Sequence, residues 1–309
     1  MVKKYGGFMG EIVNVDGLSD VAIKLIEKIS GAVGWIFNKK SSKKEAVNSF
    51  IEDIKQNESL DPLNKGILIY NAKKLIKEYS NQSQIISKAL EIITPQANPQ
   101  DVDDDWISLF LEYAKLISDE EFQELWAQIL AQECNYQHSI SKRTLNLVRH
   151  ISQTEALVFQ KVAPLIVVMP SEGFIVYDDE AMKKHGVTYT DLLMLDDCGI
   201  IKARTIGESH TLEKEEKRVI FFNSDIACLV ENYNGGIKDY TFNMYRLTQS
   251  GFELFNALMF ETNNDYVLDV IKDMAKTRNK GFRIMAKKIK EINNETMIFE
   301  EKPIFIGEN

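Results

Sequence analysis

The sequence is poor in cysteine and has no long apolar run. Its three cysteines, Cys134, Cys198 and Cys228, lie far apart and form no CxxC pair, so we expect neither a disulfide framework nor a thiolate metal site. No stretch of about 18 apolar residues occurs, and the first residues do not match a signal peptide. These absences predict a cytoplasmic protein.

Positive charge is also scarce, since the formal net charge is −9. Phosphate binding depends on lysine and arginine, so this balance disfavours general affinity for nucleic acid. No HExxH spacing and no GxxxxGK loop occurs. We therefore predict no metal, no cofactor and no catalytic residue, and the main hypothesis is a non-enzymatic protein. The alternative is an enzyme whose carboxylates converge only in the fold.

The 309 residues suffice for two or three small domains with real cores. The apolar spacing predicts a mainly α fold, α+β overall, in which a helical region and a helix-pair module precede a winged helix-turn-helix-like domain. We assign residues 1–40 to an amphipathic N-terminal helix and residues 41–150 to a helical domain. Residues 151–262 form the winged-helix-like domain, and residues 263–309 form a helix and a hairpin.

The N-terminal helix carries an apolar stripe at a spacing of three and four residues. Eight basic residues against four acidic ones in the first 44 residues add a positive charge. Three surfaces could cover the stripe: the protein's own domain, a second copy, or an anionic membrane surface at the periphery of the inner membrane. The residues of this candidate association or membrane-contact helix are Leu18, Ala22, Leu25, Ile29, Trp35, Ile36 and Phe37.

The stretch "DDDWISLFLEYAKLISDEEFQELWAQILAQE" at 103–133 predicts an antiparallel helix pair. Asp105 and Ser118 are the predicted N-caps, the latter in a capping box with Glu121. The acidic run could in principle bind a divalent cation, but its place at a helix start favours capping. Before this block, a long helix from 63 to 93 is predicted to break at 80–83. The core of the pair consists of Trp106, Phe110, Phe122, Leu125, Trp126 and Ile129.

A capping box from Ser152 to Glu155 opens a different pattern. Helix, strand, two short helices, a strand, the polar excursion 207–216 and a return strand at 217–223 follow in the order of a winged helix-turn-helix domain. Thr248 is the predicted cap of a further helix. The candidate recognition helix, "TYTDLLMLDDC", has three aspartates and no basic residue, and residues 150–262 hold 17 acidic and 10 basic residues. We therefore do not expect duplex DNA as a partner, which disfavours the alternative of a transcriptional regulator.

Three segments resemble the bacterial abortive infection protein alpha family and related domains of unknown function. They are "DEEFQELWAQIL" at 119–130, the helix with "LVRHISQTEA" at 147–156, and the leading "GLSDVAIKLIEKISGAVGWIF". The resemblance implies a role in bacterial defence against phage, by sensing or by an abortive response. In this hypothesis the winged-helix-like domain contacts a ligand or a phage or host protein, and the N-terminal helix assembles a homo-oligomer or docks the protein on a membrane. The resemblance supplies no catalytic signature.

Overall fold

The computed structural model describes residues 19–33, 43–169, 172–202, 204, 206–233, 235–258, 260–277, 281–293 and 296–308. The described residues up to Leu145 form one compact unit, and those from Asn146 onward form a second. None of the helices in these ranges combines the length and the apolar character needed to cross a bilayer. The fold is mixed α+β, with the β sheet confined to the second unit.

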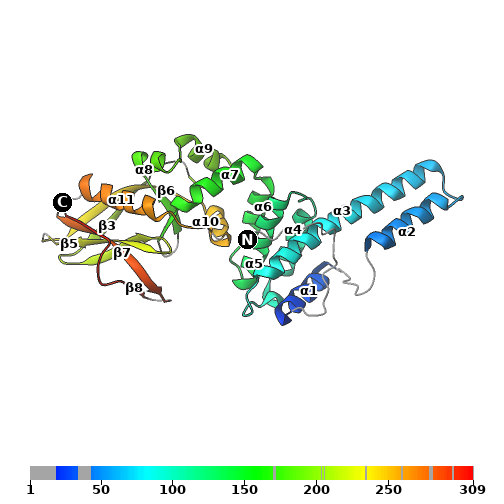
Figure 1. Cartoon of the computed structure of the whole chain (residues 1–309), viewed down its shortest axis with the longest axis horizontal. Helices are drawn as coiled ribbons and strands as arrows, with labels where there is room; N and C mark the ends of the chain where they lie inside the picture. Colours follow the sequence, from blue (N-terminus) through cyan, green and yellow to red (C-terminus); the bar gives the residue numbers. More distant parts are fainter. Residues whose placement is uncertain are drawn as a thin grey trace, which may run out of the picture. The chain divides into compact units, whose positions relative to one another are not determined.

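The first unit is helical (Figure 1). α1 packs on α4 and on a 3-10 turn, η1, while α3 packs first on α2 and then on α4 and α5. α6 crosses the boundary between the two units. The bounds are α1 (Asp20–Val33), α2 (Lys43–Gln56), α3 (Pro62–Ile92), η1 (Pro99–Asp101), α4 (Asp104–Ala114), α5 (Glu120–Asn135) and α6 (Lys142–His150).

α3 is continuous over 31 residues, so the predicted break at 80–83 is wrong. Asn81 and Gln82 lie in that segment, and their side-chain amides donate to the carbonyls of Lys115 and Leu111 at 2.8 and 2.9 Å. Polar side chains that reach a neighbouring backbone do not compete for the helix's own hydrogen bonds. The polar residues that suggested a break therefore join α3 to α4.

Two helix starts differ from the predicted ones. Asp103, rather than Asp105, is the N-cap of α4, and Asp119, rather than Ser118, is the N-cap of α5. In each helix the carboxylate accepts a hydrogen bond from the backbone N–H three residues further on. An ionised cap gains from the exposed amides and the helix dipole.

The predicted caps of the second unit are confirmed. Ser152 and Glu155 form the capping box of α7 (Gln153–Val162), and each side chain accepts from the other residue's backbone N–H. Thr248 caps α10 (Gln249–Ala257) by accepting from Gly251 N–H at 3.0 Å.

The second unit is built on a nine-stranded antiparallel sheet in the order β3-β6-β2-β1-β4-β5-β7-β8, with β9 also paired to β7. α10 packs on β2, and α11 packs on β5, β7 and β9. The remaining elements are η2 (Ala163–Leu165), β1 (Val167–Met169), β2 (Glu172–Val176), α8 (Asp179–Lys184), α9 (Tyr189–Asp197), β3 (Ile206–Leu212), β4 (Lys217–Phe222), β5 (Ile226–Asn232), β6 (Lys238–Arg246), α11 (Asn264–Thr277), β7 (Phe282–Ile292), β8 (Met297–Phe299) and β9 (Phe305–Glu308).

The predicted wing is wrong in its pairing. β3 lies inside the predicted polar excursion and pairs with β6, whereas β4 pairs with β1 and β5. Buried Asn232 at the end of β5 holds the end of β3, because its side-chain nitrogen donates to the Leu212 carbonyl at 3.0 Å. Its backbone also bonds to Glu215 and Glu216 in the turn after β3. The polar turn is therefore anchored to β5 and does not close a β3–β4 hairpin.

Gly251 permits the close approach of α10 to the backbone at Ile200, next to the isolated β-bridge of Ile201. A Cβ at this position would lie 2.0 Å from the Ile200 carbonyl oxygen, which is backbone and cannot rotate away. Because α10 or the Ile200 backbone would have to shift, we expect Gly251→Ala to lower the free energy of unfolding by at least about 1–3 kcal/mol. Beyond its chain neighbours and the backbone of its own helix, the helical glycine Gly31 has no atom within 4 Å of a built Cβ. Gly31→Ala should raise stability by up to about 1 kcal/mol. Urea denaturation measures both, and equal effects would contradict the steric argument.

Candidate functional site

The predicted helix-pair core is aromatic and largely buried. Trp106, Phe110, Trp126 and Ile129 are buried, whereas Phe122 and Leu125 are half-buried. Trp106 stacks on Phe110, and Phe110 lies against Trp126, with ring centroids 5.3 Å apart in each pair. α5 packs more extensively on α3 than on α4. The predicted helix pair is therefore part of a core that includes a third helix, α3.

A buried carboxylate, which the sequence analysis missed, supports this core. Glu133 accepts hydrogen bonds from the backbone N–H groups of His138 and Ile140, both at 2.8 Å. Burial raises the pKa of Glu133, and these hydrogen bonds oppose that shift. The Ile140 carbonyl then accepts from the Trp106 indole N–H at 2.8 Å. Glu133 continues the three-four spacing of Trp126 and Ile129, so its burial could have been predicted from the sequence.

The acidic block at the start of α4 contacts lysines. Asp104 lies 2.6 Å from Lys28 of α1, and Lys142 of α6 lies 3.0 Å from Asp103 and 3.7 Å from Asp105. The hydrogen bond from Lys142 holds the pKa of Asp103 below its usual value. No group of three or more metal-ligating side chains occurs within the described ranges. The block therefore joins the start of α4 to two other helices.

The apolar stripe of α1 turns inward. Ala22, Leu25 and Ile29 are buried, and α1 packs on α4 and η1. For residues 20–33, the surface that covers the apolar stripe is therefore the protein's own first unit. The other predicted members, Leu18, Trp35, Ile36 and Phe37, lie outside the described residues.

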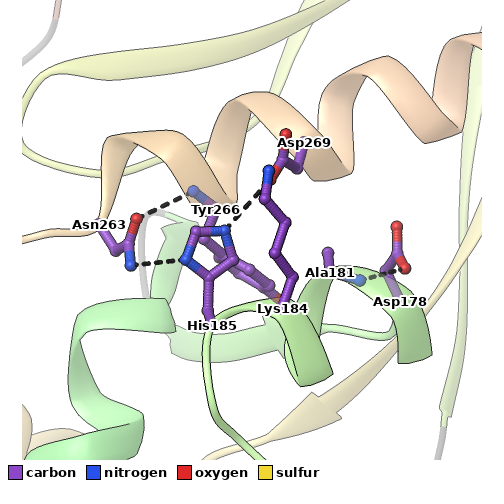
Figure 2. Close-up of polar contacts among 7 residues, drawn as sticks. All are labelled: Asp178, Ala181, Lys184, His185, Asn263, Tyr266 and Asp269. Carbon is purple, nitrogen blue, oxygen red and sulfur yellow. Dashed lines mark hydrogen bonds and ion pairs between the residues drawn. The ribbon is translucent and has the colours of Figure 1, made fainter.

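Figure 2 shows a polar cluster that joins α8 to the start of α11. The ring of His185 lies with Nδ1 3.0 Å from the Asn263 amide nitrogen and Nε2 3.1 Å from the Asp269 carboxylate. Asn263 Oδ1 accepts from Tyr266 N–H at 3.0 Å, so the amide nitrogen must face the ring. Nδ1 is therefore the acceptor, and Nε2 carries the proton donated to Asp269.

This arrangement leaves the imidazole without an available lone pair. A general base must hold a free lone pair within reach of its substrate, and the lone pair on Nδ1 is covered by Asn263. Lys184 adds an ion pair to Asp269 at 2.5 Å, and the buried Tyr266 hydroxyl donates to the Val176 carbonyl at 2.7 Å. The cluster holds α8, α11 and the end of β2 together, which is a structural role.

Among the described residues of the first unit, several exposed apolar side chains lie on α2 and the first half of α3. These two helices run side by side as a hairpin (Figure 1). We define the outer stripe as Leu63, Ile67 and Tyr70 of α3, whose exposed fractions are 73%, 49% and 66%. Phe50, Leu68 and Leu75 of the same hairpin are also exposed. Clustered apolar exposure of this kind is typical of a surface that contacts another molecule. These residues were not predicted from the sequence, although their three-four spacing is visible in it.

The family described as "Protein of unknown function (DUF2806)" matches residues 70–271, more than half of the chain. The protein belongs to the DUF2806 family. Comparison with curated proteins and with solved structures finds no match. In this DUF2806 protein, the matched residues run from the outer stripe at Tyr70 to α11 and include Trp126 and the His185 cluster.

Trp126 should be the largest single contributor to the helical core. Its side chain is fully buried, and truncating a buried tryptophan to alanine costs about 3–5 kcal/mol. We expect Trp126→Ala to lower the free energy of unfolding by this amount in urea denaturation. The control is Leu116→Ala, because Leu116 is exposed and should change stability by no more than about 0.5 kcal/mol. An unchanged melting temperature for Trp126→Ala would contradict its place in the core.

Asp269 should contribute to stability at neutral pH and lose that contribution in acid. The hydrogen bond from Lys184, and then that from His185, hold the pKa of Asp269 below its ordinary value, although partial burial opposes them. Because the folded-state pKa is the lower one, the unfolded state binds protons first, and stability falls as the pH drops below about 4.

Asp269→Asn should therefore flatten the acid side of the stability curve, measured by urea denaturation at a series of pH values. The matched control is Glu261→Gln, which removes an exposed carboxylate near the start of the same helix. A pH dependence of Asp269→Asn that equals that of the parent would contradict the role of this ion pair.

Proposed function

We propose that this DUF2806 protein acts through contact with another protein rather than through a reaction of its own. The exposed outer stripe of Leu63, Ile67 and Tyr70 supports this proposal. Apolar surface gains about 25 cal/mol per Å² when it is removed from water, so a row of three large side chains favours a partner. Their i, i+4, i+7 spacing suits the contact of one helix with another.

The stripe is well placed to bind without a large loss of entropy. It lies on a continuous helix whose second half is joined to α4 by Asn81 and Gln82. Rigid presentation reduces the ordering cost of association. Asp61 further orders the start of the helix, because its carboxylate accepts from Leu63 N–H and Asn64 N–H.

We further propose that this contact serves a bacterial response to phage, by sensing or by an abortive response. The support is the resemblance of residues 119–130 and 147–156 to the abortive infection protein alpha family. Both segments lie within the residues that the DUF2806 family covers. The proposed partner is a second copy, a phage protein or a host protein.

In this proposal, only the three helices α7, α8 and α9 correspond to the helical part of a winged-helix domain. The exposed face of α9 contacts another protein. Tyr189 and Leu193 are exposed on α9. Asp191 points inward, where it pairs with Lys161 at 2.6 Å and bonds to Thr188. α9 has no lysine or arginine to meet phosphate, so duplex DNA is not part of the proposal.

Phage challenge of cells that carry the protein tests this function. We expect the parent to reduce plaque formation by at least one phage of a broad panel, and Ile67→Asp with Tyr70→Asp to abolish the reduction. The two aspartates place charge at the centre of the proposed contact, and charge buried without a partner is strongly unfavourable.

The control for this experiment is Leu157→Asp, which charges an exposed leucine on α7, far from the stripe in sequence. It should protect as the parent does at equal protein level. A panel without any protected infection, or full protection by the double aspartate variant, would contradict the proposal.

A further inference from the structure

His210 of β3 has a buried ring nitrogen that lacks a hydrogen-bond partner. Its Nε2 atom is buried, and no described residue offers a partner within hydrogen-bond distance. The ring stacks on Phe242 of β6, with centroids 6.0 Å apart and planes 4° from parallel. The Glu208 carboxylate lies 3.9 Å from Nε2, which is too far for a hydrogen bond. An imidazolium, which donates from both ring nitrogens, would leave the Nε2 proton without an acceptor here.

Titratable and charged groups approach His210 from three strands. Burial lowers the pKa of His210, Glu208 of β3 opposes this shift, and Arg218 of β4 adds to it. Arg218 itself pairs with Glu216 in the turn before β4. Tyr240 of β6 lies opposite His210 in the register, and burial raises the pKa of its hydroxyl, so it is neutral near pH 7. The folded protein therefore favours the neutral imidazole.

The position of β3 in the sheet allows it to separate. β3 lies at one end of the strand order and pairs with β6. Glu208 ties the two strands through Arg246 at 2.9 Å, but Arg246 also pairs with Glu172 of β2 at 2.7 Å and keeps that partner if β3 leaves. Asn232 meanwhile holds the carbonyl of Leu212, the last residue of β3. β3 therefore has one anchored end, and the stretch before it can open.

We propose that His210 is a pH-sensitive switch that keeps β3 on β6 when its ring is neutral and releases residues 206–210 when the ring is protonated. A charge that is buried without an acceptor is strongly unfavourable. To reach Glu208, the ring must move about 1 Å closer, which disturbs its stacking on Phe242, and to reach water it must leave the sheet interior. Both routes weaken the pairing of β3 with β6. The switch does not depend on the proposed contact at the outer stripe.

Acid should open the switch, and neutral pH should keep it closed. In the released stretch His210 is in water and has its ordinary pKa of about 6.5, whereas its pKa in the closed sheet is lower. The released form therefore binds the proton first and gains population as the pH falls below about 6.5. Between about pH 7.5 and about pH 5.5, the open population should rise by up to about tenfold.

Hydrogen exchange of the full chain tests the release. It is read in peptides that cover residues 206–212 and is corrected for the intrinsic effect of pH on exchange. We expect the parent to open up to about tenfold more at about pH 5.5 than at about pH 7.5. His210→Phe keeps an aromatic ring against Phe242 but cannot titrate, so it should lose this increase. His210→Gln is a smaller variant with the same expected loss.

The control for this experiment is His150→Gln, which removes an exposed histidine. It should keep the pH dependence of the parent in residues 206–212. Equal opening of the parent at both pH values would overturn the switch. An increase that persists in both His210→Phe and His210→Gln would overturn it as well.

A nuclear magnetic resonance titration of the full chain with labelled histidine tests the surroundings of the ring. The midpoint of His210, identified by its loss in His210→Phe, should lie below about 6.5. Arg218→Gln removes the positive charge on β4 and should raise this midpoint. Arg143→Gln, which removes an exposed arginine of the first unit, should leave it unchanged. A midpoint at or above about 6.5, or one that Arg218→Gln does not raise, would overturn the proposed switch.

Discussion

Two side-chain amides on α3 determine how the first unit presents its surface. Asn81 and Gln82 donate to carbonyls at the end of α4, where backbone oxygens begin to lack partners within the helix. These bonds join the second half of α3 to the core around Trp126, while its first half continues in the same uninterrupted helix. An exposed stripe on a separate, hinged helix would be mobile. On a continuous 31-residue helix it has a defined direction.

The core that anchors α3 depends on polar as well as apolar contacts. Glu133 is the clearest case, because a carboxylate inside an apolar core is costly unless its oxygens are satisfied. Two backbone N–H groups meet this need and fix the loop at Ile140, whose carbonyl receives the Trp106 indole. Removing the carboxylate would therefore leave donors without partners as well as a cavity. The packing of the tryptophan and the order of the loop are coupled.

Local patterns predicted the local features of this fold. The capping box at Ser152 and Glu155 and the cap at Thr248 involve residues only three positions apart, and both are present. The burial of Trp126 followed from helical spacing alone. Even the errors at the caps of α4 and α5 were small, because several neighbouring aspartates or a serine can cap a helix equally well by type.

The failures concern contacts between distant residues. β3 pairs with β6, about 30 residues further along the chain, and the end of β3 is held by Asn232 of β5, which also lies far away in the sequence. His185 meets Asn263 and Asp269 across 78 and 84 residues, a distance over which no spacing rule applies. The predicted break in α3 failed for the same reason, since Asn81 has its partner in another helix.

Net charge shows the same limit, because a sum over the whole chain does not record which charged groups lie together. The net charge of −9 correctly describes the chain as acidic, yet it hides how the individual charges are placed. Asp191 counts against nucleic acid in the sum, but Lys161 already compensates it inside the second unit. On α3, Lys74 and Lys77 continue the three-four spacing of the outer stripe, so the exposed apolar face is followed by positive charge although the chain is acidic. The sign of the charge beside a candidate contact surface therefore cannot be read from the net charge.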